Sequence, residues 1–76
     1  MTRHFSGQRL RQERTAAGIS IERLALAIDR SAYSVQEYER GRVRPPVNVL
    51  SRIASVLGCT VDALLDDEDA ELRGAA

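Results

Sequence analysis

The sequence predicts one compact all-α domain built from five short helices. Serine and threonine residues that can cap helices recur along the chain, and the apolar residues between them repeat at spacings of three and four. Only three of the 76 residues are aromatic, so the core must consist mainly of leucine, isoleucine, valine and alanine. A chain of this length can bury one modest core but cannot form a second folded unit.

The first two helices begin with the same local signals. Ser6 is a good N-cap, and the apolar residues on both sides of it have the spacing of a hydrophobic staple. This helix should end at Gly18, because glycine readily adopts the positive φ that closes a helix. Ser20 repeats the pattern and predicts a second helix over residues 21–28.

A tight turn separates this helix from a third, which Ser31 can cap and which runs to about residue 40. A loop should follow, because a proline keeps the residue before it out of the helical conformation. Pro46 can open a fourth helix, and Thr60 can cap a short fifth helix over residues 61–65.

The charged residues are distributed unevenly, although the formal net charge is zero. Residues 1–65 contain ten arginines and six carboxylates, a net charge of +4, whereas residues 66–76 have a net charge of −4. We therefore expect a flexible segment over 1–5, a basic folded domain over 6–65, and an acidic, disordered tail over 66–76. Every cationic side chain is an arginine, whose planar fork suits phosphate and guanine.

Several functional classes find no support in the sequence. Cys59 is the single cysteine, so we expect no internal disulfide and no metal site. His4 is the single histidine, so no pair of histidines is available for catalysis or metal binding. No glycine-rich phosphate loop is present, so we expect neither an enzyme nor a cofactor. The sequence has no signal peptide and no apolar run of about 18 residues, which predicts a cytoplasmic protein without membrane contact.

The informative feature is the second helix, the tight turn and the third helix. In such an arrangement the first of the two helices can brace the other against DNA. On a helical wheel, Val35 and Tyr38 define the inward face of the third helix. The opposite face carries Tyr33, Gln36, Glu37 and Arg40. By themselves these four residues are more typical of the solvated side of a surface helix than of a face that contacts DNA.

Several stretches between residues 10 and 65 share a pattern with correct mutual spacing. They are LRQER (10–14) with Gly18, LALAI (24–28), Val35, YERGRVRP (38–45), LSRIASVLG (50–58) and VDALL (61–65). In these stretches the chain resembles the Cro and phage-repressor helix-turn-helix family, often called the xenobiotic-response-element class. The resemblance implies a five-helix lambda-repressor-like fold that binds double-stranded DNA and regulates transcription, often as a repressor, with the third helix in the major groove.

The resemblance also implies roles for individual residues. Arg14 should pair with Glu39 and tie the first helix to the end of the third. Contacts to DNA bases are implied for Ala32, Tyr33, Gln36 and Glu37, of which Glu37 could accept a hydrogen bond from cytosine. Contacts to phosphates are implied for Arg30, Arg40, Arg42 and Arg44.

Two residues depart from the family pattern. Ile21 stands where the family often has a glutamine that contacts a phosphate, which puts that contact in doubt. Asp29 stands in the turn where the family commonly has glycine, and aspartate tolerates the left-handed conformation better than most residues.

Two partners other than isolated DNA follow from these features. A domain this small contacts few base pairs, so we expect a weak homodimer that assembles cooperatively on DNA through the fourth and fifth helices, including Val47, Val56 and Val61. The alternative is a protein-interaction module with the same fold, such as an antitoxin or adaptor, which a carboxylate at Glu37 favours because phosphates repel it.

Overall fold

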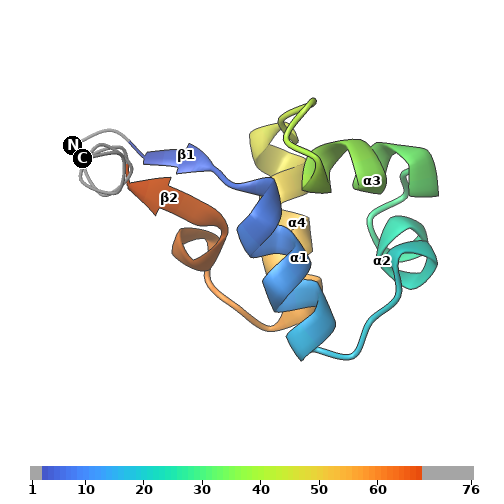
Figure 1. Cartoon of the computed structure of the whole chain (residues 1–76). Coiled ribbons are helices and arrows are strands. Elements are labelled where there is room, and N and C mark those ends of the chain that lie inside the picture. Colours follow the sequence, from blue (N-terminus) through green and yellow to red (C-terminus); the bar gives the residue numbers. More distant parts are fainter. Residues whose placement is uncertain (1–2, 68–76) are drawn as a thin grey trace.

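Four α-helices pack around one core, and a short two-stranded ribbon closes one end of the molecule (Figure 1). The structure is a computed structural model and describes residues 3–67. Its elements, in chain order, are β1 (Arg3–Phe5), α1 (Gly7–Ala16), α2 (Ile21–Ala27), α3 (Ala32–Glu39), α4 (Val47–Leu57), the 3₁₀ helix η1 (Val61–Leu64) and β2 (Leu65–Asp67). The predicted all-α class is confirmed.

Serine caps start the first three helices at the predicted residues. Ser6, Ser20 and Ser31 have extended backbone, and each side-chain oxygen accepts a hydrogen bond from the backbone N–H three residues later, at 3.1–3.2 Å. α4 instead begins after Pro46 with no side-chain cap. It ends at Gly58, whose φ of 71° is the left-handed conformation that glycine adopts without strain.

The predicted fifth helix is a 3₁₀ helix and not an α-helix. Residues 61–64 form a single 3₁₀ turn that Thr60 caps, and Leu65 already has extended backbone. The reason is that the chain leaves the turn to join β2, so too few residues remain for α-helical hydrogen bonds.

The predicted ends of the domain also need correction. Residues 3–5 are not a flexible segment but strand β1, which pairs antiparallel with β2, so Asp66 and Asp67 belong to the fold as well. Arg9 of α1 donates to the Asp66 carboxylate and holds the pKa of that group below its usual range. The rest of the predicted flexible segment and acidic tail, residues 1–2 and 68–76, lies outside the described residues.

The core is aliphatic, as the composition predicts. Tyr38 is the one buried aromatic residue among the described residues, and α3 packs on both α1 and α2 around it. No helix in the described part of the chain has the length and apolar character needed to cross a bilayer. The fully buried side chains are Leu10, Leu24, Ile28, Val35, Val49, Ile53 and Leu64.

Gly7 marks the closest approach between α1 and α3. A Cβ atom built at this position would lie 2.3 Å from the carbonyl oxygen of Tyr38 and 2.5 Å from that of Glu39. Both are backbone atoms, which cannot move aside as a flexible side chain can. The first turn of α1 therefore rests directly on the last turn of α3.

We predict that Gly7→Ala destabilises the fold by roughly 1–3 kcal/mol, because the added methyl group must push the two helices apart. Urea denaturation measures this change. Gln8→Ala is the matched control, since Gln8 is exposed on the same turn and should change stability by less than about 0.5 kcal/mol. Equal stability of the two variants would contradict the close packing described for α1 and α3.

Candidate nucleic-acid interface

The turn between α2 and α3 sets the direction in which α3 leaves the core. Asp29 has a φ of 58°, the left-handed conformation anticipated at this position, and the N–H of Arg30 donates to the carbonyl of Ala25 at 2.9 Å. Ser31 then starts α3 immediately. The tight turn keeps α2 against α3 and leaves one face of α3 in solvent (Figure 1).

The exposed face of α3 contains three of the four residues expected to contact bases, to different extents. The Tyr33 side chain is prominent, because two thirds of this residue (66%) is exposed. Gln36 is half-buried one turn later. Ala32, at the first position of the helix, is also half-buried and packs against the core, so only part of it can meet a ligand.

Glu37 does not project outward as the helical wheel predicts, because only 7% of the residue is exposed. The loop after α3 turns back onto the helix end, since the N–H groups of Arg42 and Val43 donate to the Glu37 backbone carbonyl at 3.0 and 3.4 Å, and this turn brings the Arg42 side chain near the Glu37 carboxylate. One carboxylate oxygen, Oε2, lies 3.4 Å from Arg40 and 3.9 Å from Arg42, and the other accepts from the Tyr33 hydroxyl at 3.5 Å. A helical wheel describes α3 alone and cannot include this loop.

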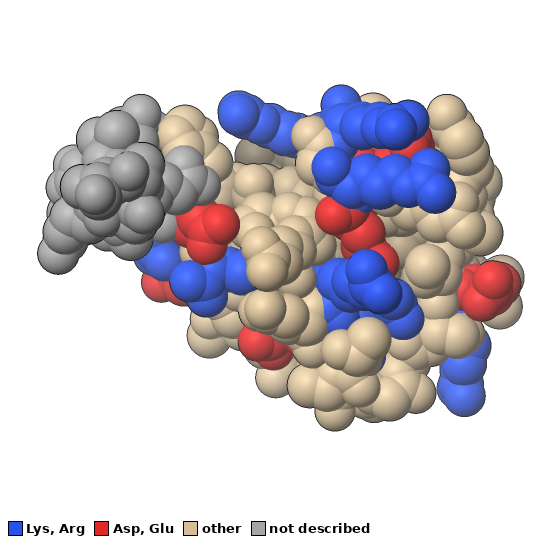
Figure 2. All heavy atoms as spheres, viewed as in Figure 1, with Lys and Arg blue, Asp and Glu red and all other residues tan. Residues whose placement is uncertain are grey.

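Arginine side chains gather over α3 and the loop that follows it (Figure 2). All four of the residues expected to contact phosphates are exposed. The Glu37 carboxylate lies beside the guanidinium groups of Arg40 and Arg42 and is largely covered. The structure thus gives this part of the surface a basic character that the zero net charge of the chain conceals. The four residues are Arg30, Arg40, Arg42 and Arg44.

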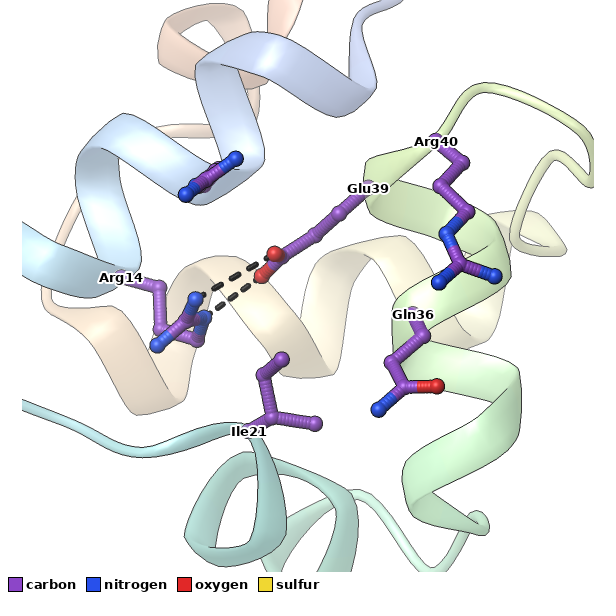
Figure 3. Close-up of a pocket in the computed structure, with 6 residues that line it drawn as sticks. Arg14, Ile21, Gln36, Glu39 and Arg40 are labelled. Atoms are coloured by element: carbon purple, nitrogen blue, oxygen red, sulfur yellow. Dashed lines mark hydrogen bonds and ion pairs between the residues drawn. The ribbon is translucent and has the colours of Figure 1, made fainter.

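Arg14 and Glu39 form the pair that the resemblance implies, and they join α1 to the end of α3 (Figure 3). The Arg14 guanidinium donates twice to the carboxylate, at 2.5 and 3.2 Å, and once to the carbonyl of Ile19 at 2.9 Å. The two side chains are 11% and 8% exposed. The hydrogen bond to Glu39 raises the pKa of Arg14, so this buried group stays charged.

An open pocket of about 270 Å³ lies beside this pair, between α1, α2 and α3 (Figure 3). Three arginines and one glutamate contribute to its walls, a balance that suits an anion. Ile21 occupies the start of α2 there and offers no polar group. The lining residues are Arg11, Arg14, Ile21, Gln36, Glu39 and Arg40.

Arg11 is the residue of this site that the sequence analysis missed. It is exposed on α1 and lines the pocket together with Arg40 of α3. Its position three residues before Arg14 places the two on one face of a helix, which is the signal that could have identified it.

The single cysteine, Cys59, is half-buried. Burial raises the pKa of the Cys59 thiol, so it stays protonated at neutral pH. No cluster of three potential metal ligands occurs within residues 3–67.

Comparison with known proteins agrees with the arrangement of α2 and α3. A family model described as a helix-turn-helix domain matches residues 7–67. The chain belongs to this family. The matched range covers every described element from α1 to β2. The match confirms the family resemblance that the sequence stretches carry.

Individual members of the helix-turn-helix family are regulators. An uncharacterized transcriptional regulator in the ATPase CF(0) region of Rhodospirillum rubrum is 43% identical over 61 residues, which are 80% of this chain and 56% of that protein. The clp gene regulator ClgR of Corynebacterium glutamicum superposes with a TM-score of 0.73 at 34% identity, covering 76% of this chain and 63% of that one. The chain therefore spans a little over half the length of these relatives.

The DNA-binding domain of the P22 c2 repressor has the same fold. It superposes with a TM-score of 0.75 at 25% identity over 84% of each chain. This similarity confirms the predicted relation to phage repressors.

We predict that a double-mutant cycle on Arg14→Ala and Glu39→Ala gives a coupling energy of roughly 1–3 kcal/mol, because each truncation leaves the other charge buried without its partner. Denaturation of the four proteins measures it. The more exposed Arg9 and Asp66 pair is the control and should give less than about 1 kcal/mol. Equal coupling in the two cycles would show that burial does not distinguish the pairs.

Proposed function

We propose that the protein binds double-stranded DNA sequence-specifically and regulates transcription, with α3 in the major groove. One observation supports this most directly: exposed arginines stand directly before and after α3, the second helix of a helix-turn-helix domain. Related chains described as transcriptional regulators support the same function. We expect repression where the bound site overlaps a promoter. A cytoplasmic location is proposed because a single cysteine, without an internal disulfide, suits a reducing compartment.

The exposed residues divide into two roles. Tyr33 is the most exposed side chain of α3 and is the main candidate for contact with bases. Ala32 could contact a thymine methyl group, and Gln36 could form a hydrogen bond with a base edge. The arginines around α3 are the candidates for phosphate contacts. We add Arg11 to them, because it lines the pocket beside Arg40 where Ile21 offers no donor.

The salt dependence of DNA binding separates the two roles. Affinity for duplex DNA should fall steeply with salt, since each neutralised phosphate releases counterions. Arg44→Ala, at an exposed arginine that does not contact Glu37, should weaken binding to all duplexes about equally and lower the salt slope by about one ion. Tyr33→Ala should instead change the preferred bases. Fluorescence anisotropy at several salt concentrations, after selection of binding sites from random duplexes, measures these effects.

Asn48→Ala is a control for this experiment, because Asn48 is exposed on α4 and outside the proposed contact set. Affinity that is indifferent to salt would reject DNA binding as the function. A uniform loss of affinity in both the Arg44 and the Tyr33 variants would reject the division of roles.

We also propose that two copies bind DNA together. A single domain contacts too few base pairs to select one genomic site, and two copies on half-sites about 34 Å apart double the contacts. Val47 supports an interface at the start of α4, because it is an apolar residue that is 80% exposed. Val56 and Val61 are half-buried against the core and offer less apolar surface.

We predict a monomer in solution and a two-to-one complex on a palindromic duplex, because so small an apolar surface gives only a weak dimer. Sedimentation with and without the duplex measures the stoichiometry. Val47→Glu should weaken the cooperativity of binding and leave the affinity for a single half-site unchanged. A one-to-one complex at saturating protein on a duplex with two half-sites would contradict the proposal.

A protein-interaction module is the second candidate, and one surface favours it. An apolar groove of about 270 Å³ lies between α2 and α4, beside the highly exposed side chain of Leu26. None of the arginines proposed to contact phosphates lines it. One domain could therefore bind DNA and a protein partner at the same time. Leu26→Glu should abolish binding of the protein partner and leave DNA binding unchanged.

A further inference from the structure

We propose that Glu37 determines the DNA specificity of this protein without touching a base, by holding Tyr33 in position. The inference rests on the proposed function and deepens it, because it assigns a different role to a residue that the family resemblance placed among the base contacts. Glu37 is a positioning residue, anchored on one side by two arginines and in contact with the tyrosine on the other.

Burial removes Glu37 from direct contact with bases. Only a tenth of its side chain is exposed, whereas the three side chains that touch its carboxylate are each more than half exposed. A base edge approaching α3 meets those side chains first. Glu37 could accept a hydrogen bond from cytosine only if they moved away, which would cost the contacts described above.

The two carboxylate oxygens of Glu37 contact different side chains. Oε2 lies near both Arg40 and Arg42, at 3.4 and 3.9 Å, so two cations at the end of α3 fix the carboxylate. Oε1 accepts from the hydroxyl of Tyr33, one helical turn earlier. The two arginines thus position the Glu37 carboxylate, and the carboxylate positions the exposed ring of Tyr33.

A ring that is already ordered before binding loses less freedom when it meets its correct base pair. The gain applies to DNA sequences that fit the ordered ring, so it increases specificity. The negative charge has the opposite effect on affinity, because it weakens the attraction of the nearby arginines for any phosphate. Removal of the charge should therefore change general affinity and specificity in opposite directions.

The test compares wild type with Glu37→Gln on two duplexes, one enriched from a random pool by the wild-type protein and one scrambled version of it. We expect Glu37→Gln to bind the scrambled duplex as tightly as wild type or more tightly. The ratio of the two dissociation constants should fall roughly tenfold, the equivalent of part of one base-pair contact. Glu13→Gln removes one negative charge from α1, away from α3, and should leave the ratio unchanged.

A second variant tests the contact with the tyrosine. Tyr33→Phe deletes the hydroxyl and keeps the ring, so it should lower the same ratio in the wild-type background and change it little when Glu37→Gln is already present. Because Tyr33 is exposed, this variant keeps the fold, and it tests the proposal even where Glu37→Gln reduces stability.

Three outcomes would overturn the proposal. An unchanged ratio in Glu37→Gln would show that the carboxylate has no part in specificity, and independent effects of the two variants would show that it does not act through Tyr33. A new preferred base at one position, with the ratio retained, would show direct contact with that base. Failure of wild type to distinguish any duplexes is a separate result, which would reject the proposed function itself.

Discussion

The buried pair of Arg14 and Glu39 is the interaction on which the rest of the structure depends. Burying two charges is costly unless their hydrogen-bonding groups are satisfied, and here Arg14 donates both to the carboxylate and to the carbonyl of Ile19. These bonds join α1, α3 and the segment that leads into α2. The close approach at Gly7 adds a steric constraint at the same junction, so the direction of α3 is fixed from two sides.

Two glutamates on α3, only two residues apart, therefore have different consequences. Glu39 pairs with Arg14 of α1 and fixes the position of the helix. The Glu37 carboxylate instead contacts the exposed side chains of Arg40, Arg42 and Tyr33. Both carboxylates are covered by arginines. The surface near α3 is basic although the chain has no formal net charge. Glu37 is covered by Arg40 and Arg42, whose guanidinium groups extend into solvent, whereas Glu39 is buried together with Arg14.

Most of the fold could be predicted because its signals are local. The serine caps, the aliphatic periodicity and the left-handed residue at Asp29 depend on neighbours within a few positions, and each occurs where expected. The burial of Glu37 could not be predicted, because it depends on a loop that folds back over α3. The ribbon was missed for a similar reason: its strands are three residues long and pair across almost the whole chain.

The ribbon and the exposed face of α3 are structurally separate. β1 and β2 lie at one end of the molecule, and α2 and α3 lie at the other (Figure 1). The ribbon is tied to the body by the hydrogen bond from Ser6 to Leu64 and by the partly exposed pair of Arg9 and Asp66. These bonds touch α1 and η1 but not α3. A change at Arg14 or Glu39, in contrast, reaches α3 directly.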